Sequence, residues 1–417
     1  MKPKHLVILT ALLIFFGSTL EFFVNFQRVA VPGTIFTELQ THYALNAGQI
    51  TAMGAWFMLC YAFGQFLIGP FIDGFGGVRS ILLGGFIFTI GVIMFPLACT
   101  ENAPCVPLLY LARALAGIGA SGIFLAVAKL VLEHFPKQES IIISIMIAIG
   151  VSGGIFAGAP LAKLLECFAL QRVFLYSGYI TLILFVICLL LSKWQELPPV
   201  GKMPFNLKNY LVLLKRKNNV VFWIFFGISY GSCYVLQTII GKKFLEDFCK
   251  MKEITAAWTI SVMGIASVAG GFLFSFISMA LGNRRKCIYQ MWVIISLFVF
   301  GGLIAQLCFG MRSGIISSAL FTLLALPTCI SGVTIPYIQE TNSPELIGTA
   351  TSMGNFSAYL AVAIFGNMTG LILKSFPANS NGVYGEKTYI ILFAVLFALL
   401  IPAAICTHLM IEPRKTK

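Results

Sequence analysis

Twelve apolar stretches, each close to the length of a membrane-spanning helix, follow one another along the chain. An α-helix rises 1.5 Å per residue, so about 20 residues cross the roughly 30 Å of hydrocarbon in a bilayer. The stretches predict spans at residues 6–32, 48–71, 80–98, 107–132, 141–163, 173–192, 220–240, 255–281, 288–309, 315–338, 347–373 and 388–410. We therefore expect an all-α membrane protein with twelve transmembrane helices.

The charge composition supports the bilayer as the solvent of this chain. Only 10% of its 417 residues are charged, against about 25% in a soluble domain. A net charge of +13 would suggest a nucleic-acid partner for a soluble protein. Here the basic residues lie in short loops between apolar stretches, which is the topology signal of membrane proteins. We expect the lipid bilayer as a partner and no nucleic acid.

One long polar stretch divides the chain into two halves. It runs from Ser192 to Asn219 and contains three prolines and the basic run KRK at residues 215–217. Two six-helix bundles joined by a central linker are typical of secondary transporters that are built from repeats. We predict an N-terminal bundle at residues 1–192, a cytoplasmic linker at 193–219 and a pseudo-symmetric C-terminal bundle at 220–417.

The distribution of Lys and Arg predicts the orientation. The loops on the side of the termini carry more of these residues than the loops on the other side, where Lys242 and Lys243 are counted. Cytoplasmic loops are the ones enriched in Lys and Arg. We predict a bacterial inner (plasma) membrane protein with both termini cytoplasmic. Cys99 and Cys105 share one short outer loop, as free thiols or as a disulfide.

Two enzyme-like patterns lack the context that their chemistry needs. A G-x-G-x-x-G pattern at residues 117–122 follows no predicted strand. A G-x-S-x-G pattern at residues 150–154 has no mid-membrane His to serve Ser152 as a base. Gly150, Gly154 and Gly158 instead recur at the spacing of close helix contacts in membranes. We expect no enzyme, no metal and no cofactor, and the absence of a Walker motif favours a gradient as the energy source.

Three motifs resemble those of the major facilitator superfamily. GPFIDGFGGVR at residues 69–79 is similar to that family's loop signature, and a degenerate copy, SMALGNRRK, stands at 278–286 in the second half. RALAGIG at 113–119 is similar to its helix 4 signature. The resemblance implies a transporter, with a conformational latch made by Asp73, Arg79 and Arg113, the last as a tether to a neighbouring backbone. FQRV at 26–29 resembles a bacterial branch near the organic-anion and phagosomal amino-acid transporters.

Polar residues inside apolar helices are the candidates for the transport site, because an ionisable group in hydrocarbon usually faces a cavity or a partner. In the first span, Glu21, Asn25 and Arg28 lie on one helix face. In the seventh, Tyr230, Tyr234 and Gln237 have the same spacing and form a matching polar stripe. Two such stripes on corresponding helices indicate a central site between two halves.

Arg28 offers a planar fork of donors for a carboxylate or phosphate of the substrate. Its alternatives are an internal pair with Glu21 or a position at the outer interface. Glu21 is the candidate for proton coupling, or else a permanent ion-pair partner. Lys129 is either a second cation of the cavity or a contact to cytoplasmic headgroups. Further substrate contacts are predicted from polar or amphipathic groups in the second and eleventh spans, where the Trp and Tyr side chains could instead be packing or interface anchors. They are Trp56, Tyr61, Gln65, Asn355 and Tyr359.

These observations lead to one hypothesis and two alternatives. We expect a monomeric, proton-linked symporter that moves a small anionic or zwitterionic metabolite, such as an organic acid or amino acid, by alternating access. An exporter of drugs or siderophores would need a wide aromatic cavity. A transporter-like ligand sensor would need an extra domain or a long tail.

Overall fold

The protein is built from membrane-length helices. The structure is a computed structural model that describes residues 4–100, 103–195, 201 and 206–413. Within these residues, twelve helical segments are long and apolar enough to cross a membrane. They are His5–Thr34, Ala47–Phe75, Gly77–Ala98, Val106–His134, Glu139–Phe156, Leu170–Ser192, Lys217–Asp247, Glu253–Ala280, Arg285–Cys308, Gly314–Thr341, Pro344–Ser375 and Glu386–Leu409. The predicted all-α membrane fold with twelve spans is confirmed.

Several spans consist of two or three successive helices. The elements are α1 (Lys4–Val29), η1 (Ala30–Thr34), α2 (Phe36–Thr41), α3 (Ala47–Phe75), α4 (Gly77–Ala98), α5 (Val106–Ala120), α6 (Ile123–His134), α7 (Glu139–Phe156), α8 (Ala159–Cys167), α9 (Leu170–Ser192), α10 (Leu207–Lys215), α11 (Lys217–Val235), η2 (Leu236–Ile240), α12 (Gly241–Asp247), α13 (Glu253–Ala280), α14 (Arg285–Cys308), α15 (Gly314–Ala325), η3 (Leu326–Thr328), α16 (Ser331–Thr341), η4 (Pro344–Leu346), α17 (Ile347–Ser375) and α18 (Glu386–Leu409).

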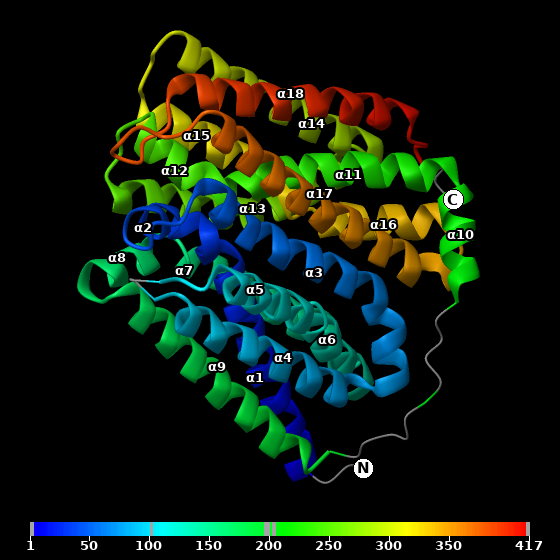
Figure 1. Cartoon of the computed structure of the whole chain (residues 1–417). Coiled ribbons are helices and arrows are strands. Elements are labelled where there is room, and N and C mark those ends of the chain that lie inside the picture. The colour runs from blue at the N-terminus through cyan, green and yellow to red at the C-terminus, as the bar shows by residue number, and fades with distance from the viewer. Residues whose placement is uncertain (1–3, 101–102, 196–200, 202–205, 414–417) are drawn as a thin grey trace.

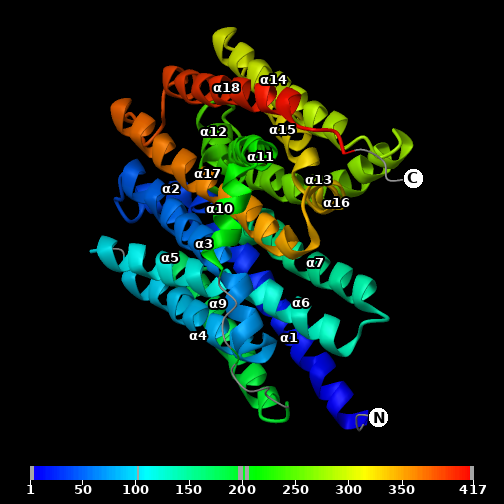
Figure 2. The ribbon, with the colours of Figure 1, turned by 90° about the vertical axis from the view of Figure 1, so that its right-hand side faces the viewer.

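The helices form two groups that follow the order of the chain. Figure 1 shows the first half, α1 to α9, in its lower part and the second half, α11 to α18, in its upper part. Both chain ends and α10 lie at one end of the helices, which we call the terminal end; α2, α8 and α12 lie at the opposite end. Viewed from the terminal end (Figure 2), the halves adjoin where α3 packs against α17 and α7 against α13.

The opposite end holds much of the core that the two halves share. The turns η1 and η2 pack against each other there, and α8 packs against α13. Val31 of the first half and Ile239 and Ile260 of the second belong to one buried apolar cluster. Apolar burial therefore joins the halves at this end.

Among the spans that the sequence analysis expected to be continuous, the fifth and the tenth show clear breaks. The fifth was predicted as one helix over 141–163, but α7 ends at Phe156 and α8 begins at Ala159. Gly158 between them has a backbone (φ −84°, ψ −116°) that lies outside the helical region. In the tenth span, the chain leaves the helix around Pro327, which cannot donate the backbone hydrogen bond of a helix interior.

The seventh span is longer than predicted, which corrects the placement of two lysines. The sequence analysis ended this helix at residue 240 and counted Lys242 and Lys243 in an outer loop. The span continues to Asp247, and the two lysines are 1% and 3% exposed. Each has an acidic partner four residues later in the same helix, Glu246 and Asp247.

Candidate functional site

A cavity of about 400 Å³ lies between the two halves. Its walls come from α1, α3, α6 and α7 in the first half and from η3, α11, α13, α16 and α17, among others, in the second. The predicted site residues that line it are Glu21, Asn25, Arg28, Tyr61, Gln65, Tyr230, Tyr234, Gln237, Asn355 and Tyr359. Trp56 is not among the lining residues. Among the lining residues, Glu21 and Arg28 alone carry charge.

Arg28 is held rigidly from both halves. Its side chain is buried, with its guanidinium carbon 4.6 Å from the ring centre of Tyr61 and 5.1 Å from that of Tyr359. Such cation–π contacts are worth about 2 kcal/mol when water is excluded. Nη1 donates to Oδ1 of Asn25 at 3.3 Å and to the hydroxyl of Tyr359 at 3.4 Å. The guanidinium plane is therefore fixed, because it is packed on two rings and bonded at one nitrogen.

The other edge of Arg28 is open for a ligand. Nε and Nη2 are buried and have no hydrogen-bond partner within the described residues. These two nitrogens point to the same side of the guanidinium, so together they can donate in parallel to two oxygens of one carboxylate. Buried donors without a partner are costly. The geometry therefore leaves one bidentate anion position next to the tyrosines.

Asn25 separates the two charges of the cavity. Its Nδ2 donates to Oε1 of Glu21 at 3.2 Å, and its Oδ1 accepts from Arg28. No ion pair joins Glu21 to Arg28 in the part of the chain that the structure describes. Oε2 of Glu21 is buried and lacks a partner there as well. Both charged groups therefore have side-chain atoms without a hydrogen-bond partner among the described residues, and both line the same cavity.

Tyrosines and amides from both halves complete the polar lining. The rings of Tyr230 and Tyr234 stack with centres 4.1 Å apart, and the hydroxyl of Tyr230 reaches that of Tyr359 at 3.5 Å. Nδ2 of Asn355 donates to Oε1 of Gln65 at 3.3 Å, across the two halves. The remaining walls are mostly apolar, with residues such as Leu125, Ile147 and Phe226.

The cavity extends toward the terminal end. Ile338 and Thr351, which line it, lie close to the ends of α16 and α17 at that side. The opposite end is sealed by hydrogen bonds between the halves. Ser261 of α13 donates to the carbonyl of Ile155 at 2.8 Å, and Lys242 donates to that of Thr34 at 2.7 Å. The structure is therefore closed at the opposite end.

Lys129 does not line the cavity, contrary to one of its two predicted positions. Its Nζ pairs with Asp73 at 3.0 Å and donates to the carbonyl of Ile72 at 3.2 Å. The predicted latch partner of Asp73, Arg79, donates to the carbonyl of Phe75 at 3.3 Å. Lys129 thus joins α6 to the last turns of α3.

Arg113 lies among backbone carbonyls. It is 1% exposed, and it donates to the carbonyls of Gln27 (3.2 Å), Val31 (2.9 Å) and Met53 (3.4 Å). Its guanidinium also lies 4.5 Å from the ring centre of Phe57. These bonds tie α5 to α1, η1 and α3 without using the cavity.

The two cysteines that were predicted to share an outer loop differ in their burial. Cys99 is buried, Cys105 is exposed, and both are free in the structure.

At the opposite end, three acidic side chains surround Lys242. The sequence analysis missed this cluster. The spacing of Lys242 and Glu246 at i and i+4 was its available signal, because it places the pair on one helix face.

Comparison with known sequences gives two findings. A family model described as Major Facilitator Superfamily matches residues 8–366. Multidrug resistance protein 2 of Bacillus subtilis (strain 168) is 24% identical over 330 residues, which cover 75% of this chain and 78% of that protein.

Comparison with solved structures gives the same fold at low identity. A variant of the nucleoside transporter NupG has a TM-score of 0.76 at 13% identity and covers 97% of this chain and 100% of its own. An inward-facing bacterial homologue of the human lysosomal transporter Spinster has a TM-score of 0.72 at 16% identity, with coverages of 98% and 97%. A D-xylose-proton symporter has a TM-score of 0.67 at 14% identity, with coverages of 93% and 96%.

Proposed function

Because the chain belongs to the Major Facilitator Superfamily, whose members are transporters and not enzymes, we propose that it carries a small carboxylate, as an anion or a zwitterion, across the bacterial inner membrane. The two halves would rock about the central cavity, which then opens to one side at a time. The proposed direction is uptake as a monomer, with both termini cytoplasmic and the cavity of this structure facing the cytoplasm.

The open edge of Arg28 is the observation that supports a carboxylate. A buried guanidinium with Nε and Nη2 free presents a two-donor edge whose geometry matches a planar carboxylate. One cation in the cavity favours one negative charge on the ligand, since a dianion would leave a charge unpaired in an apolar space. The apolar walls suit a short carbon body.

Glu21 supports coupling to protons. A carboxyl group that binds a proton can cross between the two orientations of the cavity in a neutral form, which avoids moving a bare charge through hydrocarbon. Its unpartnered Oε2 faces the same space as the open edge of Arg28. A proton on Glu21 and a carboxylate on Arg28 together would leave the loaded cavity with no net charge.

Export of drugs is the second candidate, and the similarity to multidrug resistance protein 2 is what favours it. Many apolar lining residues would accept a hydrophobic body. A cationic drug, however, would meet the unpaired charge of Arg28, and repulsion between like charges in an apolar space is strong. Lipophilic acids would be the drugs compatible with this cavity.

Uptake into proteoliposomes tests the proposed substrate class. Purified protein is assayed with labelled monocarboxylates, amino acids, phosphate esters and a cationic dye. The Arg28→Lys variant keeps the charge but loses the two-donor edge, so we expect about a 10- to 100-fold loss of apparent affinity, as removal of about 1.5–3 kcal/mol of charge-assisted bonding predicts. The matched control is Arg172→Lys at an exposed position outside the cavity. Transport of the dye alone, or equal kinetics of Arg28→Lys and wild type, would contradict the proposal.

The same vesicles test the proton. A pH gradient, acidic outside, should stimulate uptake by the wild type. The Glu21→Gln variant should lose this stimulation but keep the exchange of labelled for unlabelled substrate, because exchange needs no net proton movement. Stimulation that survives in Glu21→Gln would assign the coupling proton to another group.

A further inference from the structure

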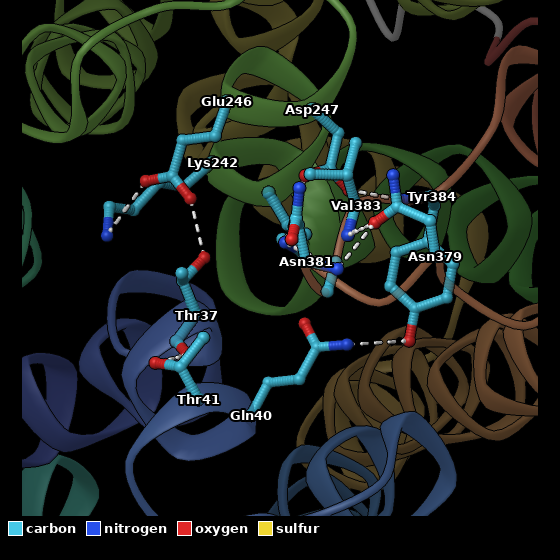
Figure 3. A network of polar contacts seen from close by, with 12 residues as sticks. Thr37, Gln40, Thr41, Lys242, Glu246, Asp247, Asn379, Asn381, Val383 and Tyr384 are labelled. Carbon is cyan, nitrogen blue, oxygen red and sulfur yellow. Dashed lines mark hydrogen bonds and ion pairs between the residues drawn. The ribbon is translucent and has the colours of Figure 1, made fainter.

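A second cluster of charges lies at the opposite end, outside the cavity. Nζ of Lys242 is 3.0 Å from Oε1 of Glu246, 3.1 Å from Oε1 of Glu253 and 3.7 Å from Oε1 of Glu38. It also donates to the carbonyl of Thr34 at 2.7 Å. Figure 3 shows Lys242 and Glu246 on α12 facing Thr37 on α2, whose hydroxyl donates to Glu246 at 2.6 Å.

The cluster joins the two halves of the protein. Glu38 and Thr37 belong to α2 of the first half, whereas Lys242, Glu246 and Glu253 belong to the second half. The side chain of Lys242 is 1% exposed, those of Glu246 and Glu38 are 13% and 15% exposed, and that of Glu253 is 46% exposed. Of these four side chains, Glu253 is therefore the most exposed to solvent. It connects the buried members of the cluster to water.

Three carboxyl groups surround one amine, so the cluster has more acid than base. Within the described residues, Lys242 of α12 and Glu253 of α13 act on Glu38, and Glu246 of α12 shares Lys242 with it. His42 at the end of α2 acts on Glu253. Lys243 and Asp247 of α12 pair with each other at 2.9 Å. With every carboxyl group ionised, the site around Lys242 would hold two uncompensated negative charges.

The carboxyl group of Glu38 is the one placed to hold a proton. Both of its oxygens are buried and accept no hydrogen bond within the described residues, and Glu253 lies within hydrogen-bonding reach. A proton on Glu38 would bond to the carboxylate of Glu253 and remove one negative charge. Burial, together with the neighbouring Glu253 carboxyl group and against the attraction of Lys242, raises the pKa of Glu38 from about 4.5 to about 8.

From this geometry we propose that Glu38 and Glu253 form a second proton-binding site, which takes up one proton from the outside when the two halves close over it. The proposal rests on the alternating-access function only in that the halves move apart at this end. In the open arrangement, α2 leaves α12 and α13, Glu38 enters water, and the proton returns to the outside solution. Closure of the opposite end is thereby linked to external acidity, separately from Glu21.

The sign of the pH dependence follows from the raised pKa of Glu38. When protonation is stronger in the closed state, closure is most favoured below the ordinary pKa of about 4.5 and loses this contribution as the pH rises through about 8. Within that window, one proton changes the closed-to-open ratio by up to about tenfold per pH unit. External acid should therefore close the opposite end, and external base should open it.

Hydrogen–deuterium exchange of the full chain in lipid nanodiscs measures this equilibrium. Exchange in peptides that cover 30–41 and 236–247 is followed between about pH 5.5 and about pH 8.5, with labelling times scaled for the pH dependence of intrinsic exchange. We expect protection in wild type to fall as the pH rises. Glu38→Gln mimics the protonated side chain, so it should stay protected throughout. The matched control, Glu166→Gln, removes an exposed ion pair with Lys163 and should titrate like wild type.

Two outcomes would overturn the proposal: a wild type whose protection at this end does not change with pH, or a Glu38→Gln variant that titrates like wild type. Glu38→Asp keeps a titratable group and should keep a pH dependence, which separates a lost proton site from a damaged fold. Glu21→Gln should keep the part of the pH dependence that Glu38 carries. If uptake of carboxylates fails while this pH dependence persists, the proposed function fails alone; if uptake and the Arg28→Lys effect hold without it, only this inference fails.

Discussion

Two buried cations differ in how many hydrogen-bond acceptors surround them. Lys242 is surrounded by acceptors, from the carbonyl of Thr34 to three carboxyl groups. Arg28 keeps Nε and Nη2 without acceptors among the described residues. A buried charge that is fully paired stabilises one arrangement, whereas one with open donors is ready for a ligand. These contacts agree with the proposed role of Arg28 in binding, and we infer that Lys242 contributes to closure.

Removal of the amine of Lys242 should be costly at the residue scale. Lys242→Met leaves buried carboxyl groups without their base, and breaking a buried pair in this way costs about 3–5 kcal/mol. We expect a clear fall in the thermal unfolding temperature of the detergent-solubilised protein. Lys163→Met, which removes an exposed pair with Glu166, should leave that temperature unchanged. Equal unfolding temperatures for both variants would show that Lys242 adds no stability.

At the scale of elements, glycines in and just after α7 set how closely this segment packs against α1 and α13. The sequence analysis singled out Gly150, Gly154 and Gly158 for close contacts. A Cβ at Gly158 would collide with Ser261, but one at Gly154 would meet only Val29, at 3.5 Å. The tightest position of α7 is instead Gly153, where a Cβ would collide with the carbonyl oxygen of Phe22 in α1. The contact between α1 and α7 therefore depends on a glycine outside the repeating pattern.

Two neighbouring substitutions test this contact. Gly153→Ala should destabilise the protein by about 1–3 kcal/mol, because backbone atoms of α1 cannot move aside without displacing the helix. Gly154→Ala should be neutral or stabilising by up to about 1 kcal/mol, since alanine favours the helix and the added methyl fits. Unfolding temperatures in detergent compare the two. A Gly154→Ala variant less stable than Gly153→Ala would contradict the packing seen here.

Ion pairs of opposite polarity lie beside the corresponding turns of the two halves. Asp73 near the end of α3 pairs with Lys129 of α6, and Arg285 at the start of α14 pairs with Glu340 of α16 at 3.1 Å. The second motif copy, at residues 278–286, contains no acidic residue. Glu340 of α16 supplies the acidic partner instead. Glycines with positive φ, Gly76 at +83° and Gly282 at +69°, shape both turns. The loops thus share geometry although their charges are exchanged.

At the scale of the whole molecule, η1 and η2 form the contact that closes the opposite end. Gly33 of η1 lies against the backbone of η2, where a Cβ would meet the carbonyl of Thr238 at 2.7 Å and that of Gln237 at 3.1 Å. A side chain at this position cannot be accommodated by a rotamer change, because the facing atoms are backbone. The halves can approach fully only when residue 33 has no Cβ.

Gly33→Ala should therefore shift the protein toward an arrangement that is open at the opposite end. We expect faster hydrogen exchange over 30–41 and 236–247 and a lower rate of uptake, since each cycle must close this end. Gly85→Ala is the control, because its Cβ would meet Leu20 and Phe185 of the same half at 3.4 Å. Unchanged exchange in Gly33→Ala would mean that η1 and η2 do not limit closure.

The sequence alone determined the membrane setting, the twelve spans and the polar stripes of the first and seventh helices. Span length and helical periodicity are local properties, so twenty apolar residues or an i, i+4, i+7 stripe can be read without a partner. The stripe residues Glu21, Asn25 and Arg28 accordingly line one cavity in the structure. That they bind substrate and proton remains a proposal.

Only the tertiary structure decided which distant groups meet. The pairing of Lys129 with Asp73, the placement of Tyr61 against Arg28 and the gathering of Glu38, Glu246 and Glu253 around Lys242 join helices far apart in the chain. Such contacts depend on how helices are rotated and how deep they lie against each other, and neither is encoded in a single helix. The closed end and the open guanidinium edge are therefore properties of the assembled bundles.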